Sequence, residues 1–467
     1  MKAIGILWNS MNDYVDLALQ DINRYAEVNE VISINFDSLF ADFISKIYPY
    51  TGKDLWKLQY KISHMDGVYN SNEIKIVFLN IDATKKSFVE RKGLYIYENV
   101  EKLKNYIRTK YKNLVKKYAF DNVYHMTDDE KEYEETIKLI INYIVKYFSD
   151  RNQIFDLNSI LYKNSYLFQS NCGKRNKLFL LDKQVIYKET KNASLEAYAE
   201  VFCYHFFKEL GINVAEYYFS KYLNNIGIIT KNFIGENEFF IDGTHLIDAY
   251  LSFLHTNKIT FNETLNHDIE LITKYNNIDD LNEMFKIFSM KYGIDFSNII
   301  RDLKKTYAID LLFLQSDRNS NNWGILVDKK NNKVRFAPLY DNSNIFNFNK
   351  PDIIREMLKN INDDEVLYSL SLKHNPTLLR IHPNQNLFTP KTELFQNIDD
   401  EEIIEYVRLL LEKIESFGLN NLINIVIDRF PTEIEEKNFQ LLINKLLVLN
   451  IANIEKTILK NKIKILK

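Results

Sequence analysis

The stretch from Leu312 to Phe346, LFLQSDRNSNNWGILVDKKNNKVRFAPLYDNSNIF, carries acidic and amide side chains at two places where apolar runs end. Asp317 precedes Asn322 by five residues, and Asp341 follows the apolar run FAPLY. Between them, WGILVD and KVRFAPL joined by KKNN predict a β-hairpin. A hairpin returns the chain to the edge from which it started, so the three side chains can converge on one cleft. Carboxylate and amide oxygens are the ligands that Mg²⁺ prefers.

Phosphoryl transfer from ATP is a reaction that would use such a set, because its transition state is stabilised mainly by positioning and by charge. Asp317 would orient the acceptor hydroxyl or accept its proton, and Asn322 and Asp341 would bind magnesium. The reaction also needs a loop that covers the phosphates with backbone N–H groups. A Lys must contact the phosphate oxygens, and a Glu from a nearby helix must hold that Lys.

Candidates for these further parts lie upstream in the expected order. The polar turn QSNCGKRNK predicts a phosphate loop, with Ser170, Asn171 and Gly173 as cofactor-binding residues. Lys188, in the predicted strand VIYKET, shares a strand face with Ile186. A Lys on an apolar face needs a partner, so we expect Lys188 to be both a catalytic and an ATP-binding residue.

Two glutamates of the next predicted helix could hold Lys188. Glu196 and Glu200 are four residues apart and so lie on one helical face. We expect one of them to pair with Lys188 and the other to lie on a solvated helix face. The segment IITKNF, residues 228–233, would link two lobes and offer backbone groups to adenine, and its Lys231 is a further predicted cofactor-binding residue.

Composition sets limits on the class of protein. The chain has 467 residues, which suits two or three domains. Its 12 Gly and seven Pro are few for this length and favour a helix-rich fold. A net charge of −3 gives no basic footprint for nucleic acid. Two cysteines cannot support a disulfide framework, and no apolar run reaches the roughly 18 residues that span a bilayer.

The order of predicted elements divides the chain into three parts. Residues 1–150 alternate short apolar strands with amphipathic helices, which predicts an N-terminal α/β accessory domain. Residues 151–235 hold short strands and one long helix and are predicted to be an N-lobe. Residues 236–467 are mostly helical and interrupted by the hairpin, which predicts a C-lobe. The fold class that this order favours is α+β. Thr127 and Glu130 have capping-box spacing at the start of the last helix of the first part.

The segments SDRNSNNWGI and FAPLYDNS resemble the catalytic and metal-binding segments of HipA-like and CtkA-type bacterial kinases, which are similar in turn to phosphoinositide kinases. IYKET, with the following EVFCYHFFKELGI, resembles their Lys strand and their helix with its Glu. The spacing to Gly211 favours Glu200 over Glu196 for that Glu. The resemblance covers roughly residues 160–430. Many relatives have His two residues after the catalytic Asp, whereas this chain has Asn319.

The resemblance implies a bilobal kinase-like catalytic domain that uses ATP and Mg²⁺ to phosphorylate a protein Ser or Thr. It also implies a toxin or effector role with a protein substrate and an antitoxin or regulatory partner. The expected location is the cytoplasm, or outside the cell as an effector without a classical signal peptide, and neither nucleic acid nor membrane is an expected partner. Two alternatives stay open, namely a pseudokinase that binds nucleotide as an interaction module and a kinase of a small molecule or lipid.

One further window, DNVYHMTDDEKEYEETI, lies in the predicted N-terminal domain. It is similar to the segment around the phosphorylated His of nucleoside diphosphate kinases, and His125 would be that His. The other hallmarks of that family are not found in the sequence, and a helix cap at Thr127 would account for part of the match.

The resemblance also predicts regulation at the phosphate loop, because HipA-like relatives can be autophosphorylated on a serine there. Ser165 and Ser170 are candidates, and Ser170 is favoured because it lies beside Gly173. A phosphoserine adds close to two negative charges and would repel the phosphates of ATP. Ser170→Asp should therefore weaken ATP binding, and Ser170→Ala should leave it nearly intact. Mass spectrometry after incubation with Mg-ATP, with an Asp317 variant as control, would contradict this regulation if residues 165–170 carried no phosphate.

Overall fold

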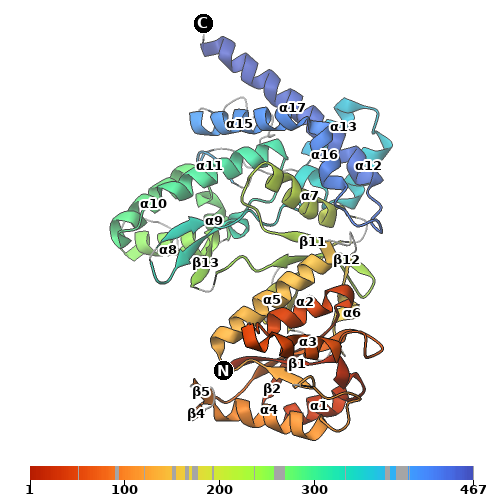
Figure 1. The fold of residues 1–467 in the computed structure, drawn as a ribbon. Helices are drawn as coiled ribbons and strands as arrows, with labels where there is room; N and C mark the ends of the chain where they lie inside the picture. The colour runs from red at the N-terminus through yellow and green to blue at the C-terminus, as the bar shows by residue number, and fades with distance from the viewer. Residues whose placement is uncertain are drawn as a thin grey trace. The chain divides into compact units, whose positions relative to one another are not determined.

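The computed structural model confirms an α+β protein (Figure 1). The chain forms two compact units, one of residues 1–189 with 220–229 and one of residues 190–219 with 230–467. The predicted division into domains at residues 150 and 235 stays a prediction. The structure describes residues 1–50, 52–89, 94–119, 121–149, 154–162, 168–170, 177–191, 194–235, 237–256, 269–331, 333–373, 379–384, 398 and 400–465.

The first unit begins with a four-stranded sheet in the order β2-β3-β1-β6, in which all three pairings are antiparallel. β3 is almost continuously apolar and lies inside the sheet, between β2 and β1. Continuous apolar runs of this length are typical of strands that are covered on both faces. The strands are β1 (Lys2–Leu7), β2 (Glu27–Asn35), β3 (Glu73–Asn80) and β6 (Tyr124–Met126).

Helices cover both faces of this sheet (Figure 1). α1 (Val15–Ile22) and α4 (Glu98–Tyr111) bury their apolar stripes against the sheet face that carries Ala3 and Leu7. On the opposite face, α5 packs against β1 and α2. The helices of that face are α2 (Phe40–Ile47), α3 (Leu55–Ser63) and α5 (Glu130–Ser149).

The prediction that Thr127 caps the N-terminus of α5 is wrong. Thr127 does not cap the helix, because its hydroxyl accepts the N–H of Ile4 at 3.0 Å and its own N–H donates to the Ile4 carbonyl. These bonds continue the pairing of β6 with β1. The cap is Asp129, whose Oδ1 accepts the N–H of Glu132 at 2.8 Å.

Short strands complete the first unit and lead into the second. A small hairpin pairs β4 (Lys86–Val89) with β5 (Leu94–Tyr97). A six-stranded sheet has the order β7-β11-β12-β10-β9-β8, and α6 (Leu157–Ile160) follows β7. Its strands are β7 (Phe155–Asp156), β8 (Phe168–Ser170), β9 (Lys177–Leu180), β10 (Val185–Glu189), β11 (Tyr217–Tyr222) and β12 (Asn225–Lys231).

The second unit is mostly helical, as the sequence predicts, and contains one small sheet of β13, β14 and β15. The hairpin predicted in the opening stretch is confirmed, with Ile325 opposite Phe336. Aromatic side chains of α7 pack on later helices, for example Phe202 on Phe439. The elements are α7 (Glu196–Glu209), β13 (Glu238–Asp242), α8 (Gly243–Thr256), α9 (Ile269–Tyr275), α10 (Ile278–Tyr292), α11 (Ser297–Leu312), β14 (Gly324–Asp328), β15 (Val334–Phe336), α12 (Pro351–Lys359), α13 (Asp364–Leu372), α15 (Glu401–Phe417), α16 (Leu419–Ile427) and α17 (Lys437–Ile465).

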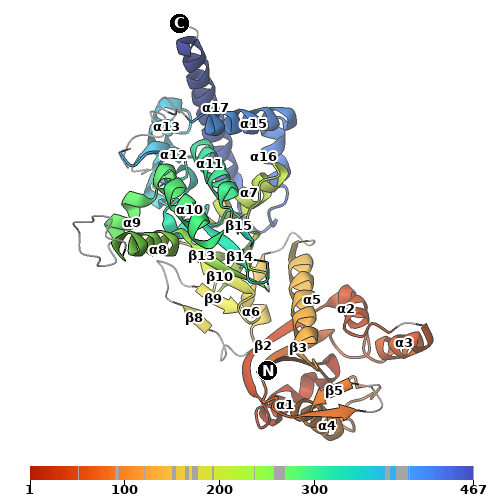
Figure 2. The same ribbon diagram turned by 90° about the vertical axis from the view of Figure 1, so that its left-hand side faces the viewer.

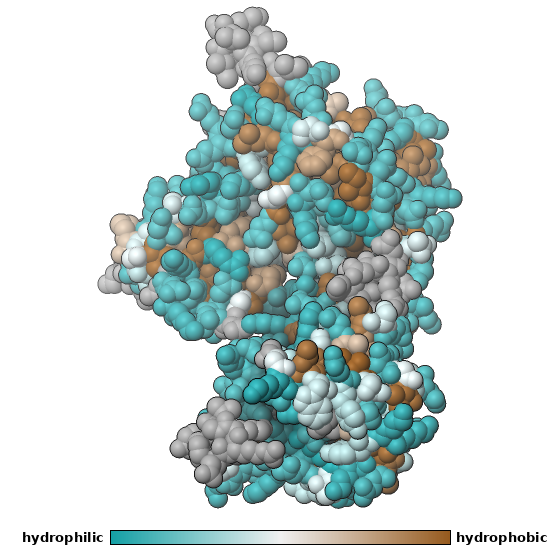
Figure 3. All heavy atoms as spheres, in the orientation of Figure 1, coloured by the Kyte–Doolittle hydropathy of each residue, from teal (hydrophilic) through white to brown (hydrophobic). Residues whose placement is uncertain are grey.

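The face drawn in Figure 3 carries hydrophobic side chains scattered among hydrophilic ones. Within the described part of the chain, no helix combines the length and the apolar character needed to cross a membrane.

Within the first unit, Glu30 of β2 clamps the turn between β9 and β10. Its carboxylate accepts the N–H groups of Leu181 at 2.9 Å and Asp182 at 3.2 Å. Both turn residues have positive φ angles of 53° and 52°, which non-glycine residues rarely adopt without support. Asp182 also receives Lys2 Nζ at 2.6 Å and the hydroxyl of Tyr133 at 2.5 Å. The N-terminal sheet is thereby tied to the strands that carry Lys188.

Because Glu30 can ionise, the free energy of unfolding of this part of the structure depends on pH. Burial raises the pKa of Glu30 to about 7, against the opposing effect of the two N–H donors. The folded state therefore binds a proton more tightly than the unfolded state, and stability is lost as pH rises from about 4.5 to about 7. We expect a loss of about 3 kcal/mol over this range.

Glu30→Gln should remove this part of the pH dependence, because the amide cannot ionise. Hydrogen exchange of peptides from residues 1–189 under increasing urea, at about pH 5 and about pH 8, measures the effect. Glu27→Gln, at the exposed start of the same strand, is the matched control and should behave like the unaltered protein. Identical pH profiles for Glu30→Gln and Glu27→Gln would contradict the prediction.

Candidate active site

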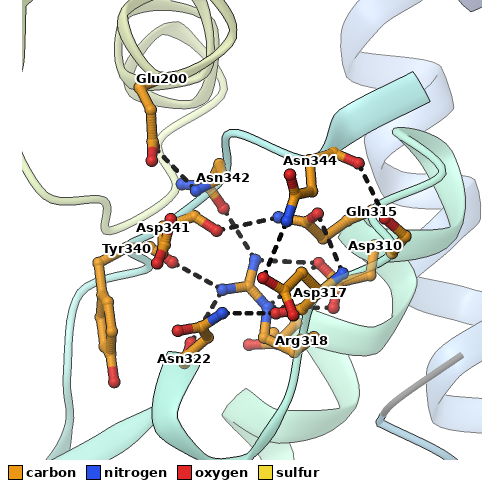
Figure 4. A network of polar contacts seen from close by, with 12 residues as sticks. Glu200, Asp310, Gln315, Asp317, Arg318, Asn322, Tyr340, Asp341, Asn342 and Asn344 are labelled. Atoms are coloured by element: carbon orange, nitrogen blue, oxygen red, sulfur yellow. Dashed lines mark hydrogen bonds and ion pairs between the residues drawn. The ribbon is translucent and has the colours of Figure 1, made fainter. Parts of the chain in front are cut away.

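Two loops of the second unit carry the predicted site. The first leaves the C-terminus of α11 and leads through a short 3₁₀ turn, Ser320–Asn322, into β14. The second follows β15. Because β14 and β15 pair in antiparallel fashion, the two loops meet, and Ala337 donates its N–H to the Gly324 carbonyl at 2.9 Å. Figure 4 shows the side chains of both loops joined in one polar network.

Asp317 is half-buried in the first loop, and amide groups hold both of its carboxylate oxygens. Asn319 Nδ2 donates to Oδ1 at 2.8 Å, and Asn344 Nδ2 of the second loop donates to Oδ2 at 2.8 Å. An ionised carboxylate has about four lone-pair sites, so it can accept more than two hydrogen bonds. Two neutral donors therefore hold the carboxylate in one orientation. Such a carboxylate is suited to orient an acceptor hydroxyl group and to accept its proton.

Asn322 lies close to Asp317, as the five-residue spacing predicted. Its Nδ2 donates to the Asp317 carbonyl at 2.6 Å, which fixes the orientation of the side-chain amide. Since the nitrogen is engaged with the loop, the amide oxygen is the atom that can serve a cation. The neighbouring Trp323 anchors the end of the loop, because its Nε1 donates to Asn276 Oδ1 at 2.9 Å. A Cβ atom on Gly243 would approach the Trp323 ring to 2.3 Å, so this packing requires glycine.

Asp341 has a left-handed backbone conformation with φ of 55°. Such a conformation is uncommon for residues other than glycine and needs support from its surroundings. The support comes from Tyr217, whose hydroxyl accepts the Asp341 N–H at 3.1 Å, and from Gln315, whose Nε2 donates to the Asp341 carbonyl at 3.0 Å. Ser343 Oγ donates to Asp341 Oδ1 at 3.2 Å. Burial, followed by the charges of Glu200 and Asp341, raises the pKa of Tyr217, which stays a neutral phenol.

Arg318 connects the two loops to each other and to α11. It is 1% exposed, and its guanidinium pairs with Asp310 of α11 at 3.1 Å. The same side chain donates to the Asn322 carbonyl at 2.9 Å, to the Tyr340 carbonyl at 2.8 Å and to Asn342 Oδ1 at 2.8 Å (Figure 4). Burial by itself would lower the pKa of Arg318, but the Asp310 carboxylate raises it above its ordinary value. Arg318 is therefore a permanent cation that fixes the backbone beside both predicted metal ligands.

Glu200 contacts the second loop rather than solvent. It is fully buried in α7, and its Oε2 accepts the N–H of Asn342 at 2.8 Å (Figure 4). Glu196 is 4% exposed, and its Oε2 accepts the Lys191 N–H at 3.0 Å. The expectation that one of these glutamates lies on a solvated face is therefore wrong. Helical spacing places both on one face, but only packing decided that this face is buried.

The remaining predicted residues lie elsewhere or outside the described residues. Lys188 is half-buried in β10 of the first unit, and its predicted pairing with Glu200 of the second unit stays a prediction. Lys231 ends β12, and its Nζ lies 3.0 Å from Glu216 Oε2. Ser170 is the last residue of β8, opposite Lys177 of β9. Asn171, Gly173 and Ser165 lie outside the described residues.

Sequence reasoning missed the side chains that hold the site together. Asp310, Gln315, Arg318, Asn342 and Asn344 all belong to the network in Figure 4 and were not predicted. A signal was available in SDRN and YDNSN, where a cation and additional amides stand beside each predicted aspartate. Asn319, which stands where many relatives have His, has a role of its own. It donates to Asp317, and its Oδ1 accepts the Asn321 N–H at 2.9 Å.

The donor set of Asn322 and Asp341 suits Mg²⁺ bound together with a nucleotide. Mg²⁺ accepts hard oxygen ligands and is usually bound through one or two carboxylates, several waters and the phosphates of the substrate. Among the described residues no group of three or more His, Cys, Asp or Glu side chains is placed to hold a metal ion. A site that takes only an amide and a carboxylate from the protein is compatible with that finding.

No protein-family model matches the chain, and no curated protein sequence matches it. Among solved structures, it is similar to the Helicobacter pylori proinflammatory kinase CtkA, with 17% identity and a TM-score of 0.46 over 63% of this chain and 93% of that chain. It is also similar to HipA in a Shewanella oneidensis MR-1 toxin–antitoxin complex with HipB and operator DNA, with 12% identity and a TM-score of 0.36 over 69% of this chain and 70% of that chain.

Arg318 should be the most sensitive structural residue of the site. Arg318→Met would leave Asp310 buried without its counter-charge, which costs about 3–5 kcal/mol. Arg335 pairs with Glu238 at 2.7 Å on the exposed surface of the same unit. Arg335→Met is the matched control and should cost less than about 1 kcal/mol. Urea denaturation of the unaltered protein and the two variants measures both losses of unfolding free energy. Equal losses for the two variants would contradict the prediction that the buried pair is the more important one for stability.

Proposed function

We propose that this protein is an ATP- and Mg²⁺-dependent phosphotransferase that phosphorylates Ser or Thr of a protein substrate. The observation that supports it best is the network of Figure 4, in which Arg318 holds the backbone beside Asn322 and Asp341, and Asn344 bridges to Asp317. One network thus holds the residues that we assign as proton acceptor and as oxygen ligands of Mg²⁺, and phosphoryl transfer requires groups of both kinds.

In this proposal Asp317 receives the acceptor hydroxyl of the substrate. The two amides of Asn319 and Asn344 keep its carboxylate oriented, so that one of its oxygens can accept the hydroxyl proton. The choice of Ser or Thr in a protein follows from the resemblance to HipA-like and CtkA-type kinases.

Asn322 and Asp341 would hold Mg²⁺, with the amide oxygen of one and the carboxylate of the other. A bound Mg²⁺ supplies positive charge that neutralises phosphate oxygens during transfer. Glu200 acts on this part of the site through the Asn342 N–H, because it holds the residue next to Asp341. Lys188 and Lys231 would contact ATP, with Ser170, Asn171 and Gly173 in the loop that covers its phosphates.

Charge-only substitutions test this assignment with the least disturbance of the fold. Asp341→Asn keeps a residue type that tolerates the left-handed conformation but removes the charge that faces magnesium, so transfer should fall to background. Asp317→Asn should lower transfer by roughly 10²–10⁴-fold and spare ATP binding much more than Asp341→Asn does. Transfer of radiolabelled phosphate from ATP to protein, with and without Mg²⁺, is the measurement.

Asp352→Asn is the control, because this side chain is 87% exposed on α12. It should transfer phosphate at the unaltered rate. Radiolabel incorporation at the unaltered rate by either Asp317→Asn or Asp341→Asn would refute the site assignment. ATP binding without any transfer by the unaltered protein would instead favour a nucleotide-binding module.

A further inference from the structure

The N-terminal sheet carries a buried cation outside the candidate active site. Lys61 of α3 is 0% exposed. Its Nζ lies 3.8 Å from the centre of the Tyr48 ring, and the described residues offer this nitrogen no hydrogen-bond acceptor. A cation–π contact recovers part of the cost of removing an ammonium group from water, but a buried charge without a counter-charge stays unfavourable.

Further donors surround the same tyrosine. His125 of β6 packs its ring edge-to-face on Tyr48, with ring centroids 5.2 Å apart. The Tyr48 hydroxyl, His125 Nε2 and Trp8 Nε1 are all buried, and none of them makes a hydrogen bond of good geometry among the described residues, although the Trp8 N–H lies close enough to the Tyr48 hydroxyl to act on it. Glu132 Oε1 lies 3.6 Å from His125 Nε2, which is too far for a good hydrogen bond. Figure 2 shows α3 beside α2 at the edge of the first unit.

Three cationic side chains lie around this cluster, and two of them have carboxylate partners. Arg108 of α4 pairs with Asp121 at 3.2 Å. Lys104 of α4 pairs with Asp128 and with Glu101. Lys61 has no carboxylate partner among the described residues. Its pKa is lowered to about 7 by burial, with Asp121 and Arg108 acting in opposite directions. Burial and the charges of Lys61, Arg108 and Lys104 lower the pKa of His125 to about 3, so this ring is neutral.

The position of His125 can therefore be explained without a role as a phosphorylated nucleophile. It is a neutral ring in an interior with several hydrogen-bond donors, beside a Lys that has no carboxylate partner among the described residues. We propose that Lys61, Tyr48 and His125 form a binding site for a small oxyanion, a phosphoryl or carboxylate group, in the N-terminal part of the chain. The oxyanion supplies the counter-charge that Lys61 lacks and accepts hydrogen bonds from Lys61 Nζ and the Tyr48 hydroxyl.

The site requires the cationic form of Lys61, which sets its dependence on pH. In the free protein this form is populated below a pH of about 7 and is lost above it. Affinity for an oxyanion should therefore fall by about tenfold for each pH unit above 7, until the pKa of the anion-bound state is reached.

Sulfate is the first probe, because its charge does not change near neutral pH, and inorganic phosphate and acetate are the second and third. Calorimetric titration of the full chain gives the affinity at about pH 6 and about pH 8, at constant ionic strength set with NaCl. Hydrogen exchange of peptides from residues 55–63 reports whether the anion acts at α3. Tighter binding of sulfate and phosphate than of acetate identifies a phosphoryl site, and the reverse order identifies a carboxylate site.

Lys61→Met is the test variant, because Met has similar length and no charge, and removal of an uncompensated buried charge should not impair folding. It should lose at least about tenfold in sulfate affinity and all of the pH dependence. Lys53→Met, at an exposed position of the same region, is the matched control and should bind sulfate like the unaltered protein.

Sulfate also stabilises proteins without binding to a specific site. Equal effects of sulfate on the unaltered protein and on Lys61→Met, or no binding at about pH 6, would overturn the proposal. None of these measurements depends on phosphoryl transfer, so they stand apart from the proposed function.

Discussion

The buried ion pair between Arg318 and Asp310 is the interaction on which the candidate active site depends. A buried pair of this kind adds little net stability compared with apolar residues, but removal of one partner is costly. The pair instead fixes the geometry of the site, because the Arg318 guanidinium donates to two backbone carbonyls, at Asn322 and Tyr340, on two different loops. Each carbonyl lies beside a predicted catalytic or metal-binding residue. The guanidinium of Arg318 therefore positions the side chains that would take part in the reaction, although Arg318 itself has no role in the proposed reaction.

The same principle explains why Asp341 adopts a left-handed backbone. Its N–H and carbonyl are held by Tyr217 and Gln315, which come from a strand and from the other loop. Glu200 adds a third constraint through the neighbouring N–H of Asn342. Backbone conformations of this kind persist only where the surroundings over-determine them. In the first unit, Glu30 holds the positive-φ turn at Leu181 and Asp182 in a comparable way.

Residue type and spacing predicted the parts of the site that lie close in sequence. The hairpin, the loop before it and the link between Asp317 and Asn322 follow from local patterns, because turn residues and alternating apolar residues act over short distances. The partners of Asp317 and Asp341 could not be predicted in this way. Asn344 and Gln315 reach across from the opposite loop, and the presence of amides near each aspartate in the sequence does not show which group each amide will meet. The capping role expected for Thr127 failed because sheet pairing with Ile4 used its hydroxyl.

By itself, the sequence determined the α+β class, most of the helices and strands, the hairpin, and the order of the residues suited to phosphoryl transfer. These features depend on periodicity, turn chemistry and composition, which are local properties of the chain. Only the tertiary structure decided that the N-terminal sheet is antiparallel, that both Glu196 and Glu200 are buried, and that Lys61 lies in the interior. Strand direction, burial of a polar face and the partner of a charge all depend on contacts between residues far apart in the chain. A local pattern carries no information about which distant residues will meet.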